Sequence, residues 1–157
     1  MMGCAHEQMG HWLAEMGASL GVKIQLSDDG YCRMKSEDET VITLVAEPAT
    51  EVFRIFLDIL PMPLENHIQI YEYCLKINLD QGYTGGASIG VDLPSYSLVL
   101  SYINQADNLT FTQFYNILQN LMGVVKKIKI DLISREQDSK PKFFNEDIDF
   151  SNHILQV

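Results

Sequence analysis

The sequence from His11 to Leu26, HWLAEMGASLGVKIQL, changes its apolar period near Gly21. Its first part continues a series of apolar residues at helical spacing: Ala5, Met9, Trp12, Leu13, Met16 and Leu20. This spacing predicts an amphipathic helix that ends at Gly21, because glycine suits the left-handed conformation of a C-cap. From Val22 to Leu26 apolar and polar residues alternate, which predicts a half-buried strand. A helix that runs directly into a strand indicates the start of an α+β fold.

Short polar turns divide the region that follows. Asp28-Asp29-Gly30 leads from Val22–Leu26 to a return strand over Tyr31–Ser36. Glu37-Asp38-Glu39 then leads to a third, β-branched strand over Val41–Ala46. Three sequential strands with short turns predict an antiparallel meander.

The segment from Glu51 to Leu60 allows two interpretations. One alternate set is wholly apolar, as in a buried helix or a buried strand: Phe53, Ile55, Leu57 and Ile59. Its aromatic and β-branched content and the following Pro61-Met62-Pro63 favour a strand. On that strand we expect the apolar set to face the core and the other set to face away from it: Val52, Arg54, Phe56 and Asp58.

The second half of the chain predicts two more helices and a hairpin. A helix over Leu64–Ile77 is apolar around a wide arc, and Gly82, Gly85 and Gly86 then predict a flexible loop. Two alternating segments, 89–93 and 98–102, predict a hairpin. A long helix follows over 111–132, which Thr110 or Thr112 can cap. We therefore predict an α+β domain over residues 1–133, in which a helix, an antiparallel β meander and a hairpin form a five- to six-stranded twisted sheet with three helices, followed by a flexible acidic C-terminal tail over 134–157.

The composition narrows the class of partner. The 157 residues fit one domain, and 11 Lys and Arg against 21 Asp and Glu give a net charge of −10. A surface this acidic repels phosphate groups, so we expect neither nucleic acid nor a membrane as a partner. The three cysteines, Cys4, Cys32 and Cys74, are an odd number without close spacing, which suits a reducing cytosol rather than a disulfide framework.

No motif in the sequence predicts catalysis, a metal or a cofactor. His6 and His11 are five residues apart, so on a helix their side chains point about 140° apart and do not share a metal. Cys74 lies among apolar residues and is expected to be a buried, inert thiol. The residues alone thus indicate a binding protein. Two alternatives stay open: an adaptor or regulator that binds a folded partner, and a small α+β enzyme in which His67 or His153 meets carboxylates in a pocket.

Four stretches carry a resemblance to a known family: His11–Leu26, Asp29–Met34, Tyr71–Leu79 and the predicted hairpin over Gly86–Ile103. In their order, and in the size and acidity of the chain, the sequence resembles the class I type III secretion chaperones, the group that includes the chaperone of the translocated intimin receptor. The resemblance covers roughly residues 6–132.

This resemblance implies an ATP-independent chaperone of the bacterial cytoplasm. Such proteins bind the extended N-terminal segment of a secreted effector and keep it stable and competent for secretion. Apolar effector side chains fill surface grooves, and an effector strand can pair with an exposed sheet edge. The resemblance also implies a homodimer built through the second helix, at Ile68, Tyr71 and Leu75, with the secretion ATPase as a further partner and no cofactor.

We expect the effector groove to combine residues of the first helix and of the fourth predicted strand. The candidates on the helix are Met9, Trp12 and Met16, because methionine adapts to unrelated apolar side chains. The candidates on the strand are Val52 and Phe56. For the three helix residues, ordinary packing in the core is an equally open interpretation.

Overall fold

The computed structural model describes residues 4–63, 65 and 67–138. These residues form four helices and five strands, in the order α1 Ala5–Leu20, β1 Tyr31–Lys35, β2 Val41–Val45, β3 Val52–Pro61, α2 His67–Asn78, α3 Gln81–Thr84, β4 Ser88–Asp92, β5 Ser97–Gln105 and α4 Phe111–Asp138. The predicted α+β class is confirmed. The sheet has five strands, and the short helix α3 adds a fourth helix to the three that were predicted.

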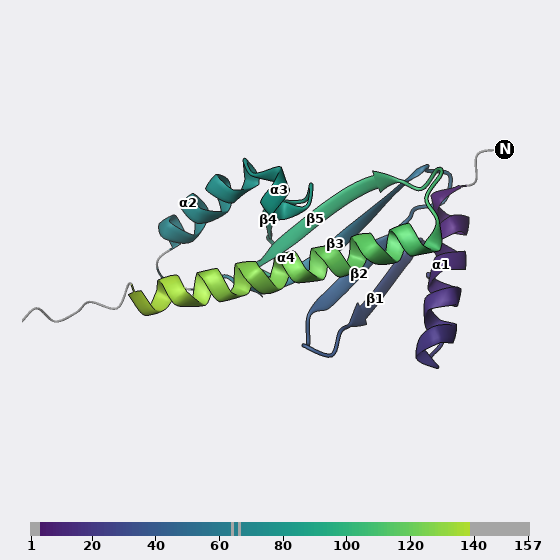
Figure 1. The fold of residues 1–157 in the computed structure, drawn as a ribbon, viewed down its shortest axis with the longest axis horizontal. Helices are drawn as coiled ribbons and strands as arrows, with labels where there is room; N and C mark the ends of the chain where they lie inside the picture. The colour runs from purple at the N-terminus through teal and green to yellow at the C-terminus, as the bar shows by residue number, and fades with distance from the viewer. Residues whose placement is uncertain (1–3, 64, 66, 139–157) are drawn as a thin grey trace, which may run out of the picture.

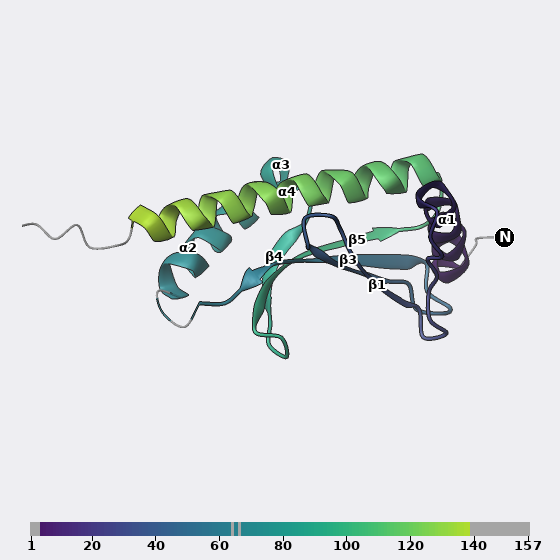
Figure 2. The same ribbon diagram turned by 90° about the horizontal axis from the view of Figure 1, so that it is seen from below.

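The strands form one antiparallel sheet in the order β1-β2-β3-β5-β4. The long helix α4 runs along one face of this sheet, and α1 lies across the beginning of α4 (Figure 1). The helix α2 lies at the end of the molecule opposite α1, and the short helix α3 lies nearer the middle, beside α4 (Figure 1). Seen from below, the other face of the sheet carries no helix (Figure 2). We call it the outer face.

The prediction of a strand over Val22–Leu26 is wrong. After the C-cap at Gly21 the chain folds back along α1, and the Val22 N–H donates to the Gly17 carbonyl at 3.0 Å. A side chain at Gly17 would lie 2.5 Å from the Val22 oxygen, so this glycine permits the close approach. Ile24 and Leu26 still pack partly against the core, which explains the alternation. The meander therefore consists of β1, β2 and β3.

The core lies between the sheet and the helices α1 and α4. The alternate set of β3 that was predicted to face the core is buried, with Phe53, Ile55 and Leu57 at 0% exposure. The Phe53 ring packs edge-to-face against Trp12 of α1 and Phe114 of α4, with centroid distances of 5.8 and 6.0 Å. One aromatic cluster thus joins the sheet to both helices.

The glycine-rich connection before β4 is ordered by α3, so the prediction of a flexible loop there is wrong. The Asp80 side chain accepts the Tyr83 N–H at the beginning of α3, and Gly85 ends the helix with φ 64°. These two caps suffice for a single turn because they satisfy backbone groups that a short helix leaves unpaired.

The long helix α4 begins with the predicted cap and ends later than predicted. The Thr110 N–H donates to Gln113 Oε1 at 2.8 Å, and the Gln113 N–H donates to Thr110 Oγ1 at 3.3 Å. The helix continues through Asp138, so residues 134–138 of the predicted tail are helical. The rest of that tail, 139–157, lies outside the described residues.

Candidate functional site

The outer face of β3 is half-exposed because no helix covers it. Val52 and Phe56 alternate with the buried set, as predicted, and share this face with Arg54 and Asp58. Phe56 is a large aromatic side chain on an open sheet face. Such a position favours contact with another molecule more than it favours folding.

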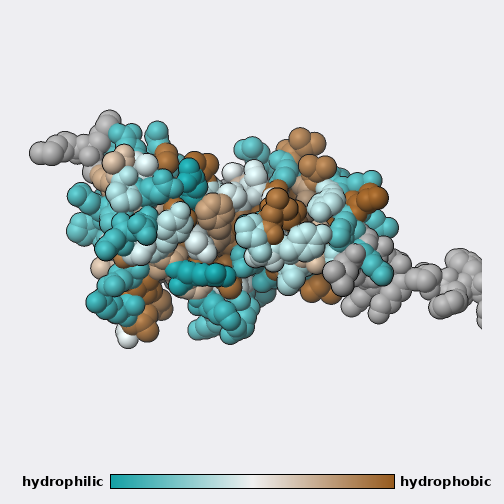
Figure 3. All heavy atoms as spheres, turned by 180° about the vertical axis from the view of Figure 1, so that it is seen from behind, coloured by the Kyte–Doolittle hydropathy of each residue, from teal (hydrophilic) through white to brown (hydrophobic). Residues whose placement is uncertain are grey.

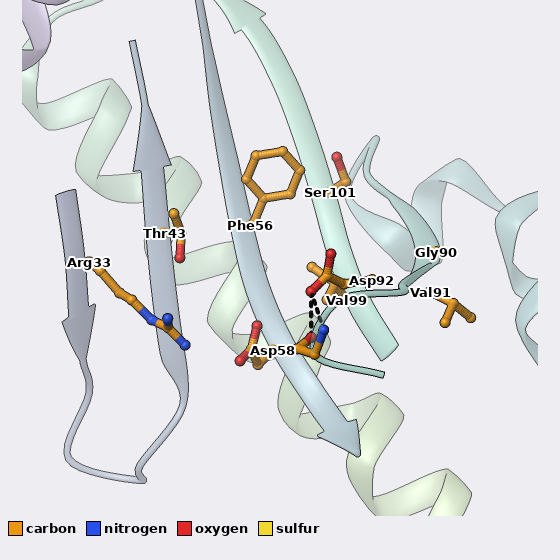
Figure 4. Close-up of a pocket in the computed structure, with 10 residues that line it drawn as sticks. Arg33, Thr43, Phe56, Asp58, Gly90, Val91, Asp92, Val99 and Ser101 are labelled. Carbon is orange, nitrogen blue, oxygen red and sulfur yellow. Dashed lines mark hydrogen bonds between the residues drawn. The ribbon is translucent and has the colours of Figure 1, made fainter. Parts of the chain in front are cut away.

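A depression of about 400 Å³ surrounds Phe56, and we call it the outer-face depression. It is lined by Arg33, Thr43, Phe56, Asp58, Gly90, Val91, Asp92, Ser95, Val99 and Ser101. Thr43 and Ser101 are the cross-strand neighbours of Phe56, so short hydroxyl side chains flank its ring (Figure 4). Gly90, opposite Val99, adds no side chain. The hollow thus results from small residues around one large one.

The rim of the outer-face depression is charged. Arg33 approaches from β1, Asp58 lies next to Phe56 on the same face of β3, and Asp92 ends β4 (Figure 4). Asp92 is held in place by Ser95, whose backbone N–H donates to Asp92 Oδ2 at 3.1 Å and whose hydroxyl donates to the same oxygen. An apolar centre with a polar rim is typical of a protein interaction site.

The sequence alone did not identify Arg33, Thr43, Asp92 and Ser101 as neighbours of Phe56. The alternation within each strand assigns each of these residues to one face of the sheet but does not say which strands are neighbours. Their proximity depends on the strand order, which brings β5 next to β3.

A second hollow lies between α1 and the irregular segment after it, with a volume of about 610 Å³. We call it the α1 groove, and it is lined by His6, Gly10, Ala14, Gly17, Ala18, Gly21, Val22, Lys23, Ile24, Gln25 and Leu26. The helix residues are mostly small, and no atom lies within 4 Å of a side chain placed at Gly10. Val22 is 56% exposed at its border. The groove therefore offers apolar surface that no side chain of α1 fills.

The structure excludes the three helix residues predicted for the effector groove from any surface site. Met9, Trp12 and Met16 are 0%, 2% and 3% exposed, and Trp12 stacks on Phe114 at 4.8 Å. Their stripe faces the sheet and α4, because an amphipathic helix buries its most apolar face. Core packing, the alternative interpretation, is the correct one for these residues. The α1 groove lies on a different face of this helix, the one that carries its small residues.

The helix α2 is apolar on two sides, as its sequence indicated. Ile70, Tyr73, Cys74 and Ile77 are buried against the rest of the molecule. Ile68 and Leu75 are 72% and 67% exposed, and Tyr71 lies between them at 38%. Figure 3 shows apolar side chains on the surface at the end of the molecule that carries α2. This exposed side is the face predicted for a dimer.

A polar cluster holds the buried side of α2 in place. The hydroxyls of Tyr73 and Tyr83 donate to Asp131 Oδ2 of α4 at 2.9 and 2.6 Å. The hydrogen bonds from Tyr83 and Tyr73 hold the pKa of Asp131 below its usual value. Burial, the main cause, raises the pKa of Tyr73 above its usual range. The cluster therefore joins α2 and α3 to α4 and leaves the opposite side of α2 exposed.

Two of the side chains considered for catalysis, Cys74 and His67, lie in the described part of the chain. Cys74 is buried, as predicted, and burial raises the pKa of its thiol to about 11. His67 packs between the rings of Tyr71 and Tyr96, and His153 lies outside the described residues. Among the described residues, no group of three His, Cys, Asp or Glu could hold a metal ion.

Within residues 4–63, 65 and 67–138, no helix combines the length and the apolar character needed to cross a bilayer.

Solved structures share this fold at low sequence identity. A chain of the ExsC–ExsE complex matches with a TM-score of 0.70 and 17% identity, over 79% of this chain and 92% of the other. A chain of the HopA1–SchA chaperone–effector complex matches with a TM-score of 0.66 and 15% identity, over 82% and 98%. A chain of the heterodimeric ExoU–SpcU complex from the type III secretion system of Pseudomonas aeruginosa matches with a TM-score of 0.58 and 13% identity, over 77% and 94%.

The family model of the Tir chaperone protein (CesT) family matches residues 11–129, whereas no individual curated protein matches the sequence. The matched region runs from within α1 to within α4 and contains every strand of the sheet. It also includes both the outer-face depression and the exposed side of α2. The chain belongs to the Tir chaperone protein (CesT) family.

Proposed function

We propose that this protein is an ATP-independent chaperone of the bacterial cytoplasm. It binds the extended N-terminal segment of a type III secretion effector and keeps that effector competent for secretion. The observation that carries the proposal is the outer-face depression around Phe56 in a chain of the CesT family. The chaperone–effector complexes among its structural neighbours support the same kind of partner.

The shape of the two hollows favours an extended ligand over a folded one. The outer-face depression is about 400 Å³, which accommodates a few side chains. The α1 groove is a separate, shallow surface that borders an irregular segment. An unfolded segment can fill such hollows one after another, and its side chains supply the apolar contacts that it lacks alone. This mode of binding needs no catalytic group, so we propose a binding protein rather than an enzyme.

We propose a homodimer through the exposed side of α2. Ile68 and Leu75 lie on one side of the helix, and Tyr71 is between them. A two-fold contact places this side against itself in the partner subunit, which is the usual arrangement of an isologous dimer. The two outer-face depressions would then belong to one continuous particle. Transfer of the effector to the secretion ATPase is the step that we propose after binding.

Capture of the effector tests this function. The full-length chain is tagged in its native cell, and the proteins that co-purify are identified together with the segment protected from protease. We expect the N-terminal segment of a secreted protein. We expect Phe56→Ala to lose that segment, since truncation of an interface anchor costs about 1–4 kcal/mol. The matched control is Ile133→Ala, which removes an exposed apolar side chain from α4.

Two results would contradict this proposal in different ways. If the wild-type chain captures no N-terminal segment of a secreted protein, the chaperone function is wrong. If Phe56→Ala captures as much as Ile133→Ala, the effector binds elsewhere and the outer-face depression is not its site.

A further inference from the structure

One row of residues across the outer face of the sheet lacks a side chain at its end. In the register of the sheet, Asp58 of β3 lies opposite Val99 of β5, and Val99 lies opposite Gly90 of β4. Gly90 brings no side chain to this row, and a Cβ placed on it would meet no atom within 4 Å. The outer-face depression therefore extends over Val99 and Gly90, where a side chain of a partner has room to lie.

Two carboxylates border this part of the depression on different strands. Asp58 begins the row on β3, and Asp92 follows Gly90 on the same face of β4, because alternate residues of a strand share a face. One strand, β5, separates β3 from β4, so the backbones that carry the two carboxylates lie about 10 Å apart. Both side chains line the depression together with the Phe56 ring (Figure 4). A group centred over Val99 could therefore approach both carboxylates.

The two carboxylates retain oxygens that no described residue uses. The Asp58 side chain makes no hydrogen bond or ion pair within the described part of the chain. Asp92 accepts both hydrogen bonds from Ser95 at Oδ2, which leaves Oδ1 available. Among the described residues that line the depression, Arg33 is the one cation, and its strand β1 is separated from β5 by two other strands. The lining thus has a net negative charge.

These charges select the kind of side chain that fits. An apolar side chain over Val99 would displace water from Asp58 and Asp92 without replacing its hydrogen bonds, which is costly. An anion would meet two carboxylates against one guanidinium group, whereas a cation compensates both carboxylates. Arginine suits the site better than lysine, because its planar guanidinium group can stack on the Phe56 ring and bind carboxylates through several N–H groups at once.

We propose that the outer-face depression binds an arginine side chain of the extended partner segment, with its guanidinium group between Asp58 and Asp92. The methylene groups of this arginine would lie against Val99, and the guanidinium plane would face the Phe56 ring. Recognition of arginine rests on the proposed function, because the arginine belongs to the effector segment. It adds which side chain of that segment the depression selects.

Titration of the full-length protein with three short peptides tests this selection. The probes are acetyl-Val-Arg-Val-amide and the same peptide with lysine or with citrulline, which has the shape of arginine without its charge. Amide chemical shifts in 150 mM salt report the site residue by residue. At this ionic strength charges beyond about 8 Å are screened, so the net charge of −10 contributes little. We expect shifts around Phe56 and Val99, and about three- to tenfold tighter binding of the arginine peptide than of the citrulline peptide.

Two variants of the depression and one control make the titration specific. Asp58→Asn removes a carboxylate that has no partner, so it should keep the wild-type melting temperature and lose most of the preference for arginine. Gly90→Val adds a side chain where a Cβ meets open space, so it should fold and weaken the binding of the arginine peptide roughly tenfold. Glu15→Gln makes the same change of charge on the exposed surface of α1 and should leave the affinities unchanged.

Several results would overturn the proposed arginine site, while the capture experiment decides the chaperone function separately. Equal affinity for the arginine and citrulline peptides would refute recognition of a cation, and equal affinity for arginine and lysine would refute selection of a guanidinium group. A preference that Asp58→Asn retains, or an affinity that Gly90→Val leaves unchanged, would place the cation elsewhere, as would shifts confined to the α1 groove. The absence of saturable shifts at millimolar peptide would refute the site. If capture succeeds and the titration fails, the effector binds without an arginine in this depression.

Discussion

Two phenylalanines on opposite faces of β3 offer a direct test of the division between core and binding surface. Phe53 is 0% exposed and packs against the rings of Trp12 and Phe114. Phe56 is half-exposed and lines the outer-face depression. Replacing each with alanine makes the same chemical change on the same strand, so the difference between the variants reports the environment alone.

We expect the two substitutions to lower the free energy of unfolding by different amounts. Truncation of a buried phenylalanine costs about 3–5 kcal/mol, and each of the two edge-to-face pairs contributes about 0.5–1.5 kcal/mol beyond burial. We therefore expect Phe53→Ala to lose about 4–5 kcal/mol, near the upper end of the range. For a chain of this length that corresponds to a decrease of roughly 8–20 °C in Tm. Phe56→Ala opens no internal cavity, so we expect a loss of about 1 kcal/mol or less.

Urea and thermal unfolding measure both variants against the wild type at one protein concentration, because the proposed dimerisation would make Tm depend on concentration. The single tryptophan, Trp12, is 2% exposed, so its fluorescence reports on the core, and circular dichroism provides an independent signal. Equal losses in the two variants, or a larger loss in Phe56→Ala, would refute the assignment of the two faces of β3.

The other predictions concern the dimer, the polar cluster and the end of the chain. Ile68→Asp should yield monomer or insoluble protein, since a carboxylate buried without a partner is costly; light scattering that finds a stable wild-type monomer at micromolar concentration would refute the dimer. Asp131→Asn should lose about 1 kcal/mol at neutral pH. The pKa of Asp131 is lowered in the folded state. The contribution of its carboxylate to stability is therefore complete above the unfolded pKa of about 4 and is lost as the pH falls through the folded pKa. The stabilities of the variant and the wild type should converge in acid, and a constant difference down to pH 2 would contradict this reasoning. A chain that ends at Asp138 should keep its melting temperature within a few degrees, because the core elements are complete before that point; a much larger decrease would mean that residues 139–157 contribute to the core.

The sequence predicted the elements that carry a strong local period. The apolar stripe of α4 and the cap at Thr110 are both found, and so is the alternation of β3. In each case a side-chain period of 3.6 or 2 reflects one large buried face, and that face is visible in the order of the residues. The exposed apolar side of α2 was predicted for the same reason.

The predictions of local structure were wrong where a sequence pattern can arise from more than one physical cause. Val22–Leu26 alternates because Ile24 and Leu26 pack against the core from a segment that lies along α1, and this placement depends on the absence of a side chain at Gly17. Alternation reports burial, and burial does not require a strand partner. The glycines before β4 likewise suggested a loop, although Asp80 and Gly85 cap a helix there.

For the proposed binding surface, the sequence by itself determined which residues of each strand share a face, and it therefore placed Val52 and Phe56 together on the outer face of β3. Tertiary structure alone decided that Met9, Trp12 and Met16 belong to the core, because an amphipathic stripe looks the same whether it faces its own sheet or a partner. It also decided that Arg33, Thr43 and Ser101 surround Phe56 and that Asn78 closes one edge of the sheet. Strand order and helix docking join residues far apart in the chain, and no local period records which of them will meet.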